Sequence, residues 1–165
     1  MRYSLFFLKP EASYAVKHYK QTVSGDNYEL AETEELEGTV GETVTATPKT
    51  YEGFTFDNTV EGTKESGEIT EDGELELVLY YTRDKYAVTY AYTGTVPSGA
   101  DPAPASAEYY HGAEVNVESL PQSVEVDGDT YAVSAWATTD VQVEEGKFIM
   151  PMSAVAFTGE FVTQK

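Results

Sequence analysis

Strict alternation of apolar and polar residues in two runs limits most strongly what this chain can fold into. Four side chains of each run share a face: Leu75, Leu77, Leu79 and Tyr81 in the first, and Tyr86, Val88, Tyr90 and Tyr92 in the second. Because successive side chains of a strand point to opposite faces, a period of two predicts strands that are buried on one side. Thirteen tyrosines and many Thr and Val residues also favour strands over helices. We therefore expect a mostly β protein.

Turn residues divide the remaining sequence into short strands. The cluster Ser24–Asn27 predicts a turn between the strands Tyr14–Thr22 and Tyr28–Gly38. Within the second of these, the Glu-rich stretch Leu30–Leu36 is the only plausible helix, but its threonine content favours a strand. Asp72-Gly73 predicts the turn that leads into the strand Glu74–Tyr81.

Two further hairpins are expected in the second half of the chain. Asp127-Gly128 predicts one turn, with Val124 and Val126 facing Tyr131 and Val133 across it. Glu145-Gly146 predicts another, between Val141–Val143 and Phe148–Met150. Val155 and Phe157 are expected on the closing strand.

A weak internal repeat predicts two modules. Tyr14-Ala15-Val16 opens one alternating run and Tyr86-Ala87-Val88 opens the other. We therefore expect a module over residues 13–84 and a second over 85–165, preceded by an extension over residues 1–12. The junction Thr82–Lys85 contains no Gly or Pro, so we expect a short, stiff linker.

Composition excludes several classes of partner. A net charge of −19 argues against nucleic acids and against anionic lipid surfaces. Cysteine is absent, which removes disulfides and thiolate metal sites. No span has the roughly 20 apolar residues of a membrane helix. The apolar run Tyr3–Leu8 is cut short by Lys9-Pro10, so we read no export signal in it and expect any signal or anchor to lie outside this chain.

The search for chemistry predicts no catalytic, cofactor-binding or metal-binding residues, and hence no enzyme. His18 and His111 lie in different modules; we expect the first to be a partly buried, hydrogen-bonded residue and the second to lie at the surface. No phosphate loop, nucleophile elbow or zinc spacing is present. Asp127-Gly128-Asp129 is too short for a calcium loop and is read as a turn.

The lysines and the aromatic residues offer two other kinds of site. A Lys–Asn isopeptide bond would need facing partners; Lys17 and Lys20 lack an Asn on the closing strand, and Asn116 is set only against Lys85, Lys147 and Lys165. Among the aromatic residues, Trp136 is expected in the core on a strand. Tyr109-Tyr110 is the better exposed candidate for stacking on a sugar or a protein. Ligand-binding residues remain unknown at this point.

The first module resembles the MucBP domains of Gram-positive surface proteins. The resemblance rests on four segments: Tyr14–Tyr19, Leu36–Glu42, Tyr51–Phe54 and Leu77–Tyr81. It implies a β-grasp-like fold in an exported adhesin, with mucin or another host glycoprotein as the partner.

The second module resembles SHIRT-type stalk repeats of the same surface proteins. The matching segments are Tyr86–Tyr90, Val126–Tyr131, Ser134–Trp136 and Met150–Gly159. Together the two resemblances imply a non-catalytic adhesin or stalk segment at the cell surface, flanked by further repeats. The alternative is an accessory β module of a larger secreted enzyme such as a glycosidase.

Overall fold

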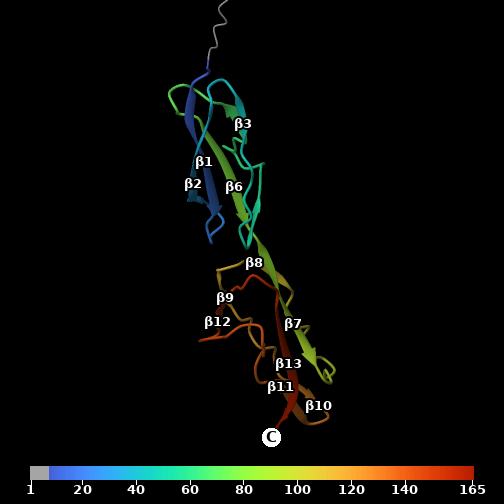
Figure 1. Cartoon of the computed structure of the whole chain (residues 1–165). Coiled ribbons are helices and arrows are strands. Elements are labelled where there is room, and N and C mark those ends of the chain that lie inside the picture. The colour runs from blue at the N-terminus through green and yellow to red at the C-terminus, as the bar shows by residue number, and fades with distance from the viewer. Residues whose placement is uncertain (1–7) are drawn as a thin grey trace, which may run out of the picture. The chain divides into compact units, whose positions relative to one another are not determined.

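The computed structural model describes residues 8–165, which form thirteen β-strands and no helix (Figure 1). The mostly β fold class predicted from the alternating runs is therefore confirmed. Contacts divide the chain into two compact units: unit 1 ends at Arg83, and unit 2 runs from Asp84 to Lys165. The predicted extension over residues 1–12 lies largely outside the described residues, and its last two residues belong to a strand that begins at Glu11.

Unit 1 is built on a four-stranded sheet with the order β2-β1-β6-β4. The bounds of its strands are β1 Glu11–Gln21, β2 Tyr28–Thr39, β4 Phe54–Phe56 and β6 Glu76–Arg83; β3 Thr43–Thr45 and β5 Ser66–Glu68 form a separate ribbon. β1 and β2 are the antiparallel hairpin predicted around Ser24–Asn27. The stretch Leu30–Leu36 is a strand, as its threonine content predicted.

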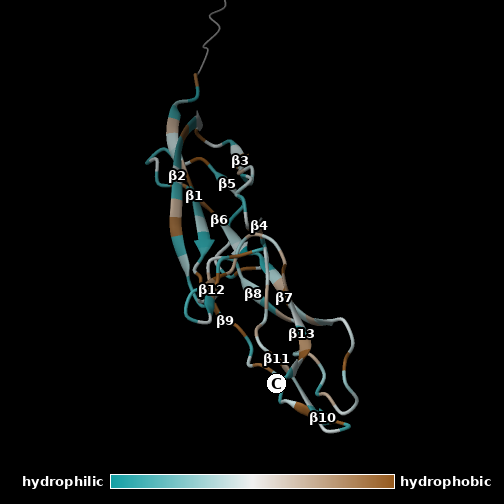
Figure 2. Ribbon diagram, turned by 90° about the horizontal axis from the view of Figure 1, so that it is seen from below, coloured by the Kyte–Doolittle hydropathy of each residue, from teal (hydrophilic) through white to brown (hydrophobic). Residues whose placement is uncertain are grey.

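The core of unit 1 is formed by the predicted inner face of β6 and by the segment that leads into this strand. Leu77, Leu79 and Tyr81 are fully buried, and Leu75 precedes them at 6% exposure. They pack against Val16 of β1 and Ile69. Figure 2 shows hydrophobic and hydrophilic residues alternating along the long strands, as expected where one sheet face is buried. The β-grasp assignment of this unit stays a prediction.

Unit 2 is built on a five-stranded sheet with the order β10-β11-β13-β7-β8. The bounds of its strands are β7 Lys85–Thr93, β8 Ala107–Tyr110, β10 Val124–Val126, β11 Asp129–Val133 and β13 Val155–Gln164; β9 Glu114–Asn116 and β12 Lys147–Ile149 form a separate ribbon. The predicted face of β7 is confirmed, because its Tyr86, Val88, Tyr90 and Tyr92 side chains contact the core.

The core of unit 2 centres on aromatic residues. Phe157 and Phe148 are buried with their ring centroids 5.6 Å apart, and Tyr90 stacks on Phe157 at 5.1 Å. Trp136 is 9% exposed and donates its indole N–H to the carbonyl of Ser119. It is a core residue as predicted, but it lies beyond the end of β11 rather than on a strand.

Both predicted hairpin turns of unit 2 form, but the strands around each need correction. Val141–Val143 forms no strand; β12 pairs instead with β9, with Phe148 opposite Val115. The Asp127-Gly128 turn is present and Val124 faces Tyr131 as predicted, but Val126 faces Asp129. Val133 pairs with Phe161 of β13. The two-residue turn sets the Val126–Asp129 register locally, whereas β12 takes its strand partner from the distant β9.

Candidate functional site

The first and last strands of unit 1 lie side by side and run in the same direction. β1 and β6 are paired over six consecutive positions, from Ala15 opposite Glu76 to Lys20 opposite Tyr81. Because the two strands are parallel, the start of β1 and the end of β6 lie at opposite ends of the ladder. The chain therefore enters unit 1 at one end and leaves it at the other.

Unit 2 repeats this arrangement with unrelated loops. β7 and β13 are parallel over six positions, from Val88 opposite Val155 to Thr93 opposite Glu160. Here too the first and last strands of the unit are direct neighbours in the centre of the sheet. A single residue, Asp84, separates β6 of unit 1 from β7 of unit 2.

These two ladders, β1–β6 and β7–β13, are the parts of the molecule that a tension along the chain would load. A pull on both ends of a unit slides parallel terminal strands along each other, so the interstrand hydrogen bonds are strained together. If the terminal strands were antiparallel neighbours, the same pull would open the bonds one after another. Each bond contributes only about 0.5–1.5 kcal/mol net, so resistance depends on how many are loaded at once.

A polar network lies on the inner face of the unit 1 ladder. His18 of β1 is fully buried; its Nδ1 lies 2.9 Å from the Tyr81 hydroxyl and its Nε2 lies 2.7 Å from a carboxylate oxygen of Glu34. The Tyr81 oxygen also accepts the backbone N–H of Lys49 at 2.9 Å. A neutral imidazole with its proton on Nε2 satisfies every partner, since the Tyr81 hydroxyl then donates to Nδ1. The prediction of a hydrogen-bonded histidine is confirmed, with burial that is complete rather than partial.

The network continues to the edge of the sheet through Glu32. Its carboxylate accepts hydrogen bonds from the Lys49 ammonium and, at 2.8 Å, from the Tyr51 hydroxyl. The hydrogen bond from Lys49, followed by that from Tyr51, lowers the pKa of Glu32. Burial and the bond to Glu32 raise the pKa of Tyr51. Lys20 lies over the Tyr51 ring, 3.9 Å from its centroid.

Glu34, His18 and Tyr81 follow the carboxylate–imidazole–hydroxyl order of a nucleophilic relay, but this one is closed. Tyr81 has no exposed surface, and burial raises the pKa of its hydroxyl. A substrate atom could not reach the oxygen, which already has two protein partners. The network therefore binds β1, β2 and β6 to the Lys49–Tyr51 segment.

Sequence reasoning missed the partners of this network, although one signal was present. Glu32 and Glu34 alternate on β2, and β2 pairs with β1 so that Glu32 lies opposite His18. Two half-buried carboxylates on one face of a strand favour partners, because removing a charge from water is costly unless it is paired. Lys49 and Tyr51 come from a segment without repetitive structure, and no local pattern places them there.

The residues of unit 2 that the sequence singled out lie closer to the core than expected. His111 is half-buried rather than at the surface, with its ring edge-on to Tyr86 at 6.5 Å. Tyr109 is half-buried and packs against the core cluster. Tyr110 is half-buried as well, and the Lys85 ammonium lies 4.6 Å from its ring centroid. The pair Tyr109-Tyr110 is thus a poor stacking platform.

The lysines considered for an isopeptide bond are mostly engaged with acids or aromatic rings. Lys17 forms an ion pair with Glu76 at 2.6 Å. Lys147 lies directly opposite Asn116 in the β9–β12 ribbon, but its ammonium pairs with Glu114 at 2.8 Å and is half exposed. Within residues 8–165 no group of three or more His, Asp or Glu side chains is arranged to hold a metal ion.

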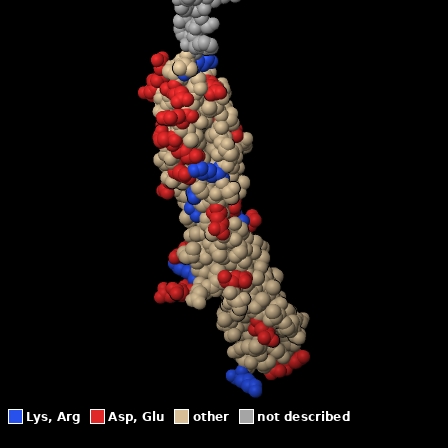
Figure 3. All heavy atoms as spheres, in the orientation of Figure 1, with Lys and Arg blue, Asp and Glu red and all other residues tan. Residues whose placement is uncertain are grey.

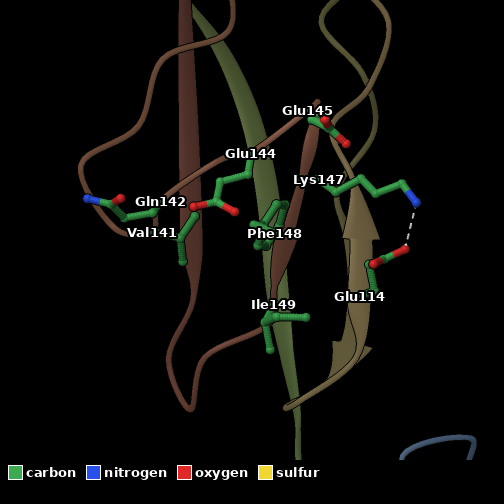
Figure 4. Close-up of a pocket in the computed structure, with 8 residues that line it drawn as sticks. All are labelled: Glu114, Val141, Gln142, Glu144, Glu145, Lys147, Phe148 and Ile149. Atoms are coloured by element: carbon green, nitrogen blue, oxygen red, sulfur yellow. Dashed lines mark hydrogen bonds and ion pairs between the residues drawn. The ribbon is translucent and has the colours of Figure 1, made fainter.

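A hollow of about 920 Å³ lies against β12 in unit 2 (Figure 4). Val141, Phe148 and Ile149 give it an apolar wall, and Gln142, Glu144 and Glu145 a polar one. Figure 4 shows Lys147 turned toward Glu114 and away from Glu144.

Carboxylates are spread unevenly over the surface. Figure 3 shows them gathered over the β2 side of unit 1, where Glu29, Glu32, Glu34, Glu35 and Glu37 all lie on one strand. β2 is also an edge of its sheet. Charged side chains on a long edge strand discourage its pairing with other chains.

Across the part of the chain that the structure covers, no helix is long and apolar enough to span a membrane.

The chain is similar to domains 3–4 of the Streptococcal High Identity Repeats in Tandem (SHIRT) region of a cell surface protein, at 15% identity and a TM-score of 0.38. The match covers 92% of this chain and 98% of the other. No family model matches the chain, so the MucBP resemblance gains no support and stays a prediction. No curated protein matches either.

Proposed function

We propose that this chain is a non-catalytic, load-bearing spacer of a cell-surface protein. The observation that carries the proposal is the parallel pairing of first and last strands in both units. Two units with different loops share it, and in each it directs the chain through the unit from end to end. A spacer that holds a distant domain against external drag needs this geometry, whereas a module that only binds a ligand does not.

The junction between the units supports the same role. With Asp84 as the only residue between β6 and β7, tension in one ladder passes to the next through one peptide unit on each side. Arg83 is anchored on the unit 1 side, where its backbone N–H donates to the Gln21 side chain at 2.9 Å. On the unit 2 side the Asp84 carbonyl accepts the backbone N–H of His111 at 3.2 Å.

Single-molecule force spectroscopy tests the proposal on unit 2 within the whole chain. The sequence has no cysteine, so handles can be attached at introduced ones. The pair Lys85→Cys and Lys165→Cys pulls the β7–β13 ladder in shear. The pair Lys85→Cys and Ala154→Cys pulls the starts of the same two strands apart and opens the ladder one bond at a time. All three positions are exposed.

We expect the shear pair to unfold unit 2 at a severalfold higher force than the opening pair at the same loading rate. Equal forces in the two directions would contradict a load-bearing role for the ladder. Thermal unfolding of both double variants serves as the control: Lys85→Cys, which removes the ammonium over the Tyr110 ring, is common to both, and exposed substitutions such as Ala154→Cys and Lys165→Cys change stability by about 0.5 kcal/mol or less.

A further inference from the structure

In unit 2 the hairpin around Glu145-Gly146 closes by a single residue pair and then opens. Glu144 and Lys147 exchange two backbone hydrogen bonds of 2.9 Å. Glu145 and Gly146 both have positive φ, 51° and 75°, as a tight two-residue hairpin turn requires. Beyond that pair, no pairing joins Val141–Val143 to β12 within residues 8–165. The hollow described above lies at this opening.

Beyond Lys147, the backbone of β12 is paired with β9 alone. Met150 donates its N–H to the Ala113 carbonyl, and the Gly146 carbonyl accepts the N–H of Val117, both at 2.8 Å. Because bonding directions alternate along an antiparallel pair, the N–H and C=O of Ile149 point away from β9, toward the hollow. Within residues 8–165, β12 has no second neighbouring strand that could pair with them.

The side chains beside this open edge are exposed and apolar. Ile149 is 59% exposed and Val143 is 41% exposed, while Phe148 lies beneath them in the core. Apolar side chains next to unpaired strand backbone are what an added strand needs, since backbone bonds provide affinity and the alternate side chains provide selectivity. A volume of about 920 Å³ is within the range of natural ligand sites.

The charge around the opening selects the partner. The Lys147 ammonium is already paired with Glu114 at 2.8 Å, so Glu144 and Glu145 give the opening a negative rim. The chain as a whole carries −19, so a second copy would be repelled. A segment with basic residues would be attracted.

We propose that the open edge of β12 binds an extended peptide segment of a partner protein in which basic and apolar residues alternate. The segment adds as a strand beside Ile149, with its apolar side chains on Ile149 and Val143 and its basic ones near Glu144 and Glu145. It occupies the space that the unformed half of the hairpin leaves open. This binding site does not depend on the proposed load-bearing role, and the experiment below tests it separately.

The probe is an acetylated and amidated octapeptide of alternating Lys and Val, titrated into the full chain and followed by backbone NMR. We expect the Ile149 amide to exchange quickly with solvent in the free protein and to become protected when the peptide binds. An octapeptide of alternating Glu and Val should not bind.

Two variants separate strand addition from general charge attraction. Ile149→Pro removes the outward N–H at a position where an edge strand tolerates proline, and Ile149→Val keeps it. The loss of one backbone bond should weaken binding of the Lys-Val peptide about tenfold in Ile149→Pro, with little change in Ile149→Val. Glu144→Gln with Glu145→Gln should weaken binding as well and leave the backbone edge intact.

Three results would overturn the proposal. The first is an Ile149 amide that is already protected in the free chain, which would mean that Val141–Val143 closes the hairpin itself. The second is equal affinity of Ile149→Pro and Ile149→Val for the Lys-Val peptide, which would leave only charge attraction. The third is the absence of any binding by that peptide.

Discussion

At position 159 the backbone of β13 passes against the indole of Trp136. A Cβ at Gly159 would lie 2.7 Å from the indole Cζ3 atom and 2.9 Å from Val133 Cγ1, closer than real contacts allow. We therefore expect Gly159→Ala to destabilise unit 2 by about 1–3 kcal/mol, the usual cost of overpacking a core. Chemical denaturation measures the loss, and Thr158→Ala on the exposed face of the same strand is the matched control.

The same substitution has a spectroscopic consequence. Trp136 is the only tryptophan, so its emission reports on this contact alone. Displacement of the ring by the new methyl group should move the emission of Gly159→Ala to longer wavelength in the folded protein. A Gly159→Ala variant with unchanged stability and unchanged emission would mean that the Trp136 ring and Val133 move aside without a loss of unfolding free energy.

Glu32 makes stability depend on pH in a defined direction. Its pKa in the folded protein is lowered below the usual 4.5, first by the hydrogen bond from Lys49 and then by that from Tyr51. A lowered folded-state pKa means that the unfolded chain binds the proton more readily, so the contribution is complete above about pH 4.5 and is lost as the pH falls through the folded-state value.

We therefore expect Glu32→Gln to be less stable than the parent protein at pH 7 and nearly as stable once the pH falls below the folded-state pKa of Glu32. Denaturant unfolding of both proteins across this range measures the difference. Glu35→Gln, on the other face of β2, is the matched control and should show a smaller difference. If the difference in unfolding free energy between Glu32→Gln and the parent protein stays constant with pH, the effect of the substitution comes from packing.

At the scale of elements, the β10–β11 hairpin offers a test of turn geometry alone. Asp127 and Gly128 have φ of 53° and 89°, and a Cβ at Gly128 would meet no atom within 4 Å. Gly128→Ala should therefore cost about 1–2 kcal/mol from the left-handed backbone, without any clash. Gly128→Asn should cost less, because Asn tolerates this region. Equal thermal stability of the two variants would show that this turn is not under backbone constraint.

Local patterns predicted the elements whose burial is decided within one strand. The alternation of Leu77, Leu79 and Tyr81 places them in the core whichever strands lie beside them. The turn at Glu145-Gly146 forms as predicted, but its ladder ends after the Glu144–Lys147 pair; β12 takes its strand partner from β9, some thirty residues earlier, and Val141–Val143 forms no strand. No local rule ranks a distant partner above a near one.

The candidate sites were less predictable for the same reason. Parallel pairing of β1 with β6 joins residues about sixty positions apart, and two well-predicted strands carry no sign of being neighbours. Lys49 and Tyr51 reach Glu32 from an irregular segment, and the open edge at Ile149 exists only because the predicted hairpin does not close.

For the whole molecule, charge sets the conditions under which both units are stable. Residues 1–83 contain 17 acidic and 7 basic residues, and residues 84–165 contain 12 and 3, so each unit is strongly negative by itself. Repulsion among the excess carboxylates opposes the compact state. The ion pairs that salt would weaken lie at the surface, such as Lys17–Glu76 and Lys147–Glu114, where solvent already screens the attraction between the partners.

Screening of charges by salt should therefore stabilise the folded protein more than it destabilises it. Between 10 mM and 0.5 M NaCl the screening length falls from about 30 Å to less than 10 Å. Across that interval the repulsion within each unit is largely removed, and we expect the melting temperature to rise. Calorimetry at fixed pH 7 measures it, with choline chloride as a control for specific sodium binding. A melting temperature that falls with salt would mean that favourable ion pairs such as those around Lys49 outweigh the repulsion among the excess carboxylates. The acidic surface would then contribute to the stability of each unit.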